Sequence, residues 1–134
     1  MQEVYNKIKE ISYVIIILSF MPNVVLSDWA KGVTSYSRGN YLEAFDEFGK
    51  ISSIDYRAQF WLGKMYLDGH GVPRNLTEAK RWLSMAATNP SVQDVRAMHE
   101  LYLIAVEEDN IEQQVFFLRK IINKKEEIMD FDMY

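Results

Sequence analysis

Apolar and small residues recur at intervals of three and four over residues 28–122, which is the spacing of amphipathic helices. The first unit has two such segments, on either side of a turn at residues 38–40. Two short helices joined by so short a turn pair side by side in antiparallel directions. The apolar and small positions of this unit are Trp29, Gly32, Val33, Tyr36, Tyr41, Ala44, Phe45, Phe48 and Ile51.

Three of these positions predict a repeat architecture. Gly32, Ala44 and Phe48 stand at relative positions 0, +12 and +16. This spacing is typical of a tetratricopeptide hairpin, in which small residues let two helices approach closely while an aromatic side chain fills the next groove. Neighbouring hairpins of this kind stack on one another and bury a continuous core.

A second unit spans residues 53–87. Its first helix is expected over about residues 57–67, and a turn follows at Gly69–Pro73. The two glycines of this turn permit positive φ, and Pro73 prevents the helix from continuing. Asn75 or Thr77 can cap the second helix. Asn89–Pro90 then ends the unit.

The second unit also carries a motif. It reads A-x-x-x-L-G-x-M-Y-x-x-G-x-G-V from Ala58 and A-x-x-W-x-x-x-A-A from Ala79. The segment resembles a complete Sel1-like repeat (SLR), a tetratricopeptide-like repeat with a longer hairpin loop. This resemblance implies an all-α fold, a short right-handed α-solenoid of about three helix-turn-helix hairpins, and a role in binding other proteins. The repeat positions with a structural role are then Gly32, Ala44, Phe48, Leu62, Gly63, Tyr66, Gly69, Gly71, Ala79, Trp82 and Ala86.

The third unit is degenerate but in phase with the others. Leu118 stands 70 residues after Phe48, and Ala97 stands 39 residues after Ala58. Tyr102 replaces the repeat glycine and Gln114 replaces the repeat alanine. Terminal repeats are commonly atypical, so residues 95–122 are interpreted as a capping hairpin that ends the repeat domain of residues 28–122. Residues 123–134 are interpreted as an acidic tail, either a frayed helix end or a short docking segment.

Residues 1–27 have the order of a secretory signal peptide. Lys7 and Lys9 precede an apolar run over residues 11–21, Pro22 follows, and a V-x-S site ends at Ser27. We therefore expect cleavage before Asp28 and an exported protein, periplasmic or secreted. The alternatives are an uncleaved membrane anchor at residues 11–26, which is short of the roughly 20 residues that span a bilayer, and a buried core helix.

Composition excludes several classes of function. The net charge of −4 disfavours a nucleic-acid binder, which needs clustered cations to neutralise phosphates. The chain has no cysteine, so disulfides, thiolate metal sites and a cysteine nucleophile are excluded. His70, between two turn glycines, is expected to be exposed, and His99 is expected on a polar helix face. Neither belongs to a metal-ligand pattern, and no cofactor motif is present.

The charged clusters are interpreted as solvated surface. Residues 107–109 are expected to form an acidic loop, without a paired-carboxylate site. Lys80 and Arg81 are expected to pair with Glu78 within their helix. The alternative is that these cations, together with Lys64 and Arg74, form a patch for an acidic partner.

Two functions remain. The first is a protein-binding module without catalytic residues, either an exported SLR adaptor or an inhibitor or immunity protein, with contact to a membrane only through an uncleaved N-terminus. The second is a secreted SLR enzyme of the β-lactam-hydrolase type, for which Ser84 and Ser91 lack a convincing activating partner. Partners of helical repeats commonly lie along the first helices of the hairpins. Lys31, Gln59 and Lys64 are therefore the expected contact residues, with Ser35 also facing outward.

Overall fold

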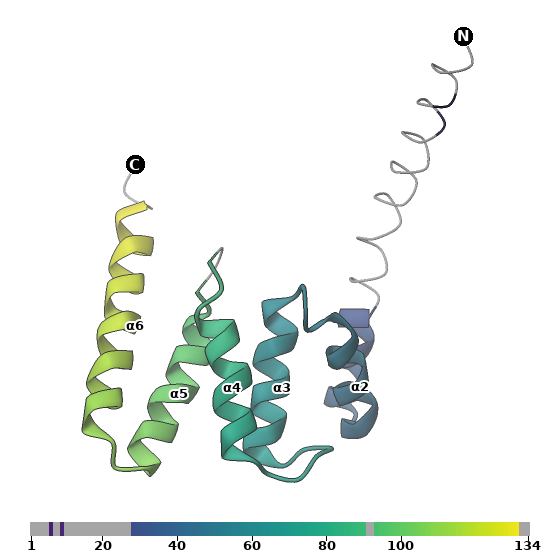
Figure 1. Ribbon diagram of the computed structural model, residues 1–134, viewed down its shortest axis with the longest axis horizontal. Helices are drawn as coiled ribbons and strands as arrows, with labels where there is room; N and C mark the ends of the chain where they lie inside the picture. The colour runs from purple at the N-terminus through teal and green to yellow at the C-terminus, as the bar shows by residue number, and fades with distance from the viewer. Residues whose placement is uncertain (1–5, 7–8, 10–27, 91–92, 132–134) are drawn as a thin grey trace.

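The computed structural model describes residues 6, 9, 28–90 and 93–131, and this part of the chain is helical without strands. Residues 28–37 are helical, and the helices that follow stack side by side in chain order (Figure 1). They are α2 (Tyr41–Ile51), α3 (Tyr56–Asp68), α4 (Leu76–Ala87), α5 (Val95–Glu107) and α6 (Ile111–Phe131). The predicted all-α repeat fold is confirmed. The expected signal segment lies outside the described residues.

In each of the first two hairpins, the two helices pack closely together at a glycine of the first helix. A Cβ atom added to Gly32 would lie 2.6 Å from the ring of Phe48 in α2, and one added to Gly63 would lie 2.7 Å from Cγ of Leu83 in α4. Phe48 and Leu83 are both completely buried. The two helices of each hairpin therefore pack so closely that a side chain at the glycine position would collide with the core.

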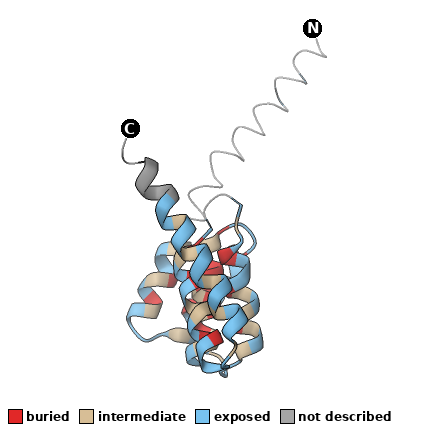
Figure 2. Ribbon diagram, turned by 90° about the vertical axis from the view of Figure 1, so that its left-hand side faces the viewer, coloured by how far each residue is buried: buried red, intermediate tan, exposed pale blue. Residues whose placement is uncertain are grey.

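Stacking of the hairpins buries two apolar clusters. The first joins the residue 28–37 helix, α2 and α3 around Phe48 and Met65, with Trp82 of α4 packed at its edge. The second joins α3, α4 and α5 around Leu83 and Met98. Buried residues run through the middle of the stack, whereas α6 is mostly exposed (Figure 2). No described helix has the length and apolar character that crossing a membrane requires.

The turn of the second hairpin contacts the first hairpin. Gly71 has φ of +76°, and a Cβ atom there would lie 2.7 Å from the backbone of Tyr41. His70 is half-buried, because its ring stacks on Tyr41 with centroids 4.2 Å apart. The Tyr36 hydroxyl lies 3.0 Å from Nδ1 of His70, and burial raises the pKa of Tyr36. The expectation that His70 is an exposed turn residue is wrong, because the turn folds back onto α2.

Two buried aspartates cap the first helices of the second and third hairpins. The side chain of Asp55 accepts a hydrogen bond from the backbone N–H of Arg57, and Asp94 accepts one from the N–H of Arg96. At the start of α4, Asn75 accepts from the N–H of Glu78. These caps satisfy amide groups that have no partner inside their own helices.

The third hairpin differs from the other two. Half-buried Tyr102 stands at the glycine position, and Leu118, at the position of Phe48 and Leu83, is 41% exposed. Helix α6 continues without a break past residue 122 to Phe131. Most of the segment expected as a separate tail is therefore helical.

Substitutions of three glycines should separate backbone strain from steric collision. Gly71→Ala should destabilise the protein by about 2–4 kcal/mol, since it adds both an unfavourable φ and a collision with Tyr41. Gly39 has φ of +81°, but the space around its Cβ position is open. Gly39→Ala should therefore lower the free energy of unfolding by about 1 kcal/mol. Gly49→Ala, inside α2 with open space, should be neutral or stabilising by about 0.5–1 kcal/mol. Urea unfolding followed by circular dichroism measures all three. Equal losses for Gly71→Ala and Gly39→Ala would contradict the contact with Tyr41.

The cap at Asp55 should make stability depend on pH. Burial alone would raise the pKa of Asp55, but hydrogen bonds from the Arg57 side chain and backbone outweigh it and lower the pKa below 3.8. The charged cap therefore stabilises the fold above about pH 3.8, and this contribution is lost as pH falls through the lower folded-state pKa. Asp55→Asn should lower the free energy of unfolding by about 1–3 kcal/mol at pH 7. This difference from the wild type should shrink as pH falls below 3.8.

The control for this experiment is Asp46→Asn, which removes an exposed carboxylate of α2. Its effect should be small at every pH, because exposed charges contribute little to stability. A cost of Asp55→Asn that stays constant from pH 7 to acid denaturation would show that the charge of Asp55 does not stabilise the fold.

Candidate protein-binding surface

Two arginines connect the first helices of successive hairpins. The guanidinium carbon of Arg57 in α3 lies 4.3 Å from the ring centroid of Trp29, which belongs to the preceding first helix. In the same way, that of Arg96 in α5 lies 4.6 Å from the ring centroid of Phe60 in α3. Trp29, Arg57, Phe60 and Arg96 therefore form an Arg–aromatic ladder across three hairpins, stabilised by cation–π attraction.

Aspartates hold the two arginines in place. Nε of Arg57 donates to Oδ1 of Asp55 at 3.0 Å, and Nε of Arg96 donates to Oδ1 of Asp94 at 3.1 Å. These hydrogen bonds raise the pKa of both arginines, which stay charged. The side chains of Arg57 and Arg96 are nevertheless 36% and 55% exposed. The ladder thus presents two oriented cations to solvent at a low entropic cost for further binding.

The sequence contains a signal for this ladder. Asp55-Tyr56-Arg57-Ala58 and Asp94-Val95-Arg96-Ala97 share the pattern D-x-R-A, 39 residues apart. That interval matches the interval between the repeat alanines Ala58 and Ala97. The aromatic partners could not be found in this way, because they lie one hairpin earlier and contact the arginines only after the hairpins stack.

A hollow of about 440 Å³ opens beside the second arginine of the ladder. Its volume is within the range of ligand pockets in proteins. Phe60 and Ile121 supply apolar surface, and the charged lining residues are Arg96, which pairs with Asp94, Glu100, which pairs with Lys64, and Lys125. The lining residues are Phe60, Val95, Arg96, His99, Glu100, Ile121 and Lys125. This ladder end can therefore receive an apolar side chain with an acidic neighbour.

The three predicted contact residues have different environments. Lys31 is 53% exposed and forms ion pairs with Glu43 and the buried Glu47. Lys64 is 30% exposed, and its Nζ lies 3.2 Å from Asp68 and 3.6 Å from Glu100 of α5. Both lysines thus reach the surface while they connect neighbouring helices.

Gln59 does not face outward as predicted. It is only 8% exposed, and its Nε2 donates to the main-chain oxygen of Ser52 at 2.8 Å. Ser35, also expected outside, is 5% exposed and donates to Glu43. Both predictions are wrong because each first helix is covered on two sides, by its hairpin partner and by the neighbouring hairpin.

Buried Glu47 is the centre of the ion pairs at the first hairpin. Its carboxylate accepts a hydrogen bond from Lys31 and lies 3.0 Å from Nζ of Lys50. The hydrogen bonds from these two lysines lower the pKa of Glu47 and outweigh its burial. Lys31 is therefore needed to balance a buried charge, in addition to any contact with a partner.

The basic residues of the second unit pair with the third hairpin. Nη2 of Arg74 lies 3.0 Å from Glu107, and Nζ of Lys80 lies 2.6 Å from Glu108. Arg81 pairs with Glu78 in its own helix as expected, but Lys80 does not. The acidic turn at residues 107–109 therefore joins two hairpins, in addition to contacting solvent.

The catalytic candidates fall on separate surfaces. His99 is exposed at the hollow, and exposed Ser84 lies on α4, whereas Ser91 lies outside the described residues. Among the described residues, His, Asp and Glu side chains form no group of three that could hold a metal ion.

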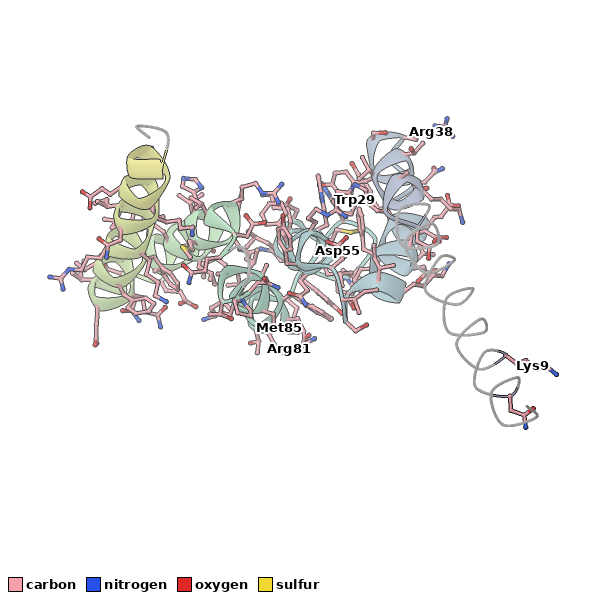
Figure 3. All side chains as sticks on the ribbon, turned by 90° about the horizontal axis from the view of Figure 1, so that it is seen from above. Lys9, Trp29, Arg38, Asp55, Arg81 and Met85 are labelled. Atoms are coloured by element: carbon pink, nitrogen blue, oxygen red, sulfur yellow. The ribbon has the colours of Figure 1, made fainter. Side chains whose placement is uncertain are left out.

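Seen from above, Trp29 lies across the stack from Arg81 and Met85, which project from α4 (Figure 3).

Comparison with known proteins identifies the second hairpin. Residues 57–91 match the family model of the Sel1 repeat. No curated protein and no solved structure is significantly similar to the chain. The match covers nearly all of α3, the turn that contacts Tyr41, and α4. Residues 57–91 of this chain are therefore similar to a Sel1 repeat, as the A-x-x-x-L-G-x-M-Y motif indicates.

Proposed function

We propose that this chain is an exported protein-binding module whose Arg–aromatic ladder and adjoining hollow hold a segment of a partner protein. Sel1 repeats generally mediate protein–protein interaction. The observation that carries the proposal is the second arginine of the ladder. Arg96 is fixed between Asp94 and Phe60, is 55% exposed, and borders an open hollow. A rigid, partly exposed arginine beside apolar surface is typical of the residues that dominate binding energy at interfaces.

The charges of this surface favour an acidic partner segment. The hydrogen bond to Asp94 is the largest influence on the pKa of Arg96 and raises it, whereas the nearby positive charge of Arg57 is a small influence that lowers it. Lys125 adds a third cation at the hollow. A carboxylate of the partner would pair with the exposed part of Arg96 or with Lys125, and an apolar side chain beside it would contact Phe60 and Ile121. The proposed ligand is therefore a peptide segment in which an acidic residue adjoins a large apolar one.

Export is the second part of the proposal. Its support is the order of basic residues, apolar run, Pro22 and V-x-S site in residues 7–27. The absence of cysteine fits a protein whose stability outside the cytoplasm rests on packing alone. The proposed partner would then be another protein of the envelope or the extracellular space.

Arg96→Ala should weaken partner binding about tenfold or more, which is the effect of losing a moderate hot-spot arginine. The partner is first identified by photo-crosslinking in the native host, with a benzoylphenylalanine at position 99 in the hollow and a control at position 85 on α4. Binding of the purified partner is then measured by calorimetry, and circular dichroism reports the fold of each variant.

The matched control is Arg81→Ala. Arg81 is also an exposed arginine, paired with Glu78 and stacked 4.2 Å above the ring of Trp82, but it lies across the molecule from Trp29 of the ladder (Figure 3). The Arg81→Ala substitution should leave the affinity for the partner unchanged. Equal affinities for Arg96→Ala and Arg81→Ala would remove the ladder from the interface.

The export proposal predicts a processed N-terminus. Protein recovered from its native host should begin at or near Asp28, because Val25 and Ser27 stand where signal peptidase requires short side chains. Intact-mass measurement of the envelope and soluble fractions tests this. An unprocessed chain that begins at Met1 in the soluble cytosolic fraction would contradict export, and an unprocessed chain in the membrane fraction would favour the anchor.

A further inference from the structure

Helix α6 exposes a continuous apolar stripe. Ile111, Val115, Leu118 and Ile122 are 62%, 44%, 41% and 52% exposed. Their spacing of four, three and four places them along one face of the helix, in the pattern of a coiled-coil seam. The half-buried residues of α6 lie on a different face, which packs against α5; they include Gln114, Phe117 and Ile121. The exposed stripe is therefore a second apolar surface of α6.

In the second hairpin, two of the four equivalent positions are buried. Leu118 stands 35 residues after Leu83, and Ile122 stands 35 residues after Ala87. Leu83 and Ala87 are 0% and 4% exposed, because they share an apolar cluster with residues of the following helix, α5. The stripe thus occupies the side of α6 on which a following hairpin would stack.

The described residues provide no cover for this surface. Helix α6 stands at the end of the stack, with its outer side open (Figures 1 and 2). A terminal repeat normally presents a polar outer face to solvent. Here isoleucine stands where the second hairpin has Ala87, so the apolar surface is larger than in the buried equivalent. Such a stripe indicates an interface.

We propose that the stripe binds a second copy of this chain, with the two α6 helices antiparallel. Related by a twofold axis between residues 116 and 117, Val115 faces Leu118 of the second copy, and Ile111 faces its Ile122. Each apolar residue of the stripe then has an apolar counterpart. The same patch is used on both copies, so the assembly closes as a dimer.

Charge complementarity selects the second copy and the antiparallel direction. Exposed Glu112 and Arg119 flank the stripe on the side away from α5. In an antiparallel pair these positions lie on the same side of the seam, so Glu112 of each copy meets Arg119 of the other. In a parallel pair the two positions lie on opposite sides of the seam and cannot meet. The dimer therefore gains two equivalent ion pairs.

Disulfide trapping tests the geometry, and the absence of native cysteine makes each introduced thiol unique. Full-length Val115→Cys and Leu118→Cys chains with different affinity tags are mixed and oxidised. The proposal expects mixed disulfides to exceed the disulfides within either single variant severalfold, since a disulfide requires Cα atoms about 4.4–6.8 Å apart. Gln113→Cys, on the opposite side of α6, should not cross-link. If disulfides between two Val115→Cys chains outnumbered the mixed disulfides, or if no disulfide formed, the antiparallel pair would be overturned.

A charge swap tests the specificity without altering the apolar stripe. Glu112→Arg and Arg119→Glu should each weaken dimerisation about tenfold in sedimentation equilibrium, because each places like charges together twice. The double variant should restore the wild-type constant. Association through residues 11–26 would respond to none of these changes. A wild-type chain that remains monomeric, or a double variant as weak as the single ones, would overturn the proposal and leave the stripe to a different protein.

Discussion

The contact between a glycine of the first helix and a large apolar side chain of the second determines how each hairpin packs. Phe48 packs against Gly32, and Leu83 packs against Gly63, at distances that leave no room for a Cβ atom on either glycine. Both large side chains become completely buried. In the third hairpin Tyr102 replaces the glycine, and Leu118 is left partly exposed. The loss of one glycine contact thus accompanies the change from a buried repeat position to an exposed apolar stripe.

The turn that distinguishes the second hairpin connects all three hairpins. It spans residues 69–75, whereas the turns at residues 38–40 and 108–110 are four residues shorter. Gly71 and His70 pack against Tyr41 of the first hairpin, and Arg74 reaches Glu107 of the third. The stack is therefore held by contacts at its loops as well as by the apolar clusters between its helices. This coupling explains why the turn histidine His70 is half-buried.

The candidate interface arises from the same stacking. An arginine near the start of each later first helix is held by its own cap aspartate, and its guanidinium covers an aromatic ring of the preceding first helix. Each arginine contributes to the fold and still presents charge to solvent. Because Phe60 and Arg96 border the hollow, the structural contact and the proposed binding contact share the same side chains. Stability and binding at this surface are therefore linked.

Periodicity and glycine placement are local properties, so they predict the helices, the order of the hairpins and the residues at which helices pack closely. The sequence also contains the D-x-R-A pattern, although not its aromatic partners. The burial of polar residues, in contrast, depends on how the helices pack together. Gln59 and Ser35 lie on faces that a single amphipathic helix would expose, but a helix in a stack is covered by its hairpin partner and by the next hairpin. The contacts with the next hairpin do not appear in local periodicity, since they depend on how the hairpins are rotated relative to one another. For the same reason, local periodicity does not distinguish the exposed apolar stripe of α6 from the buried faces of the earlier helices.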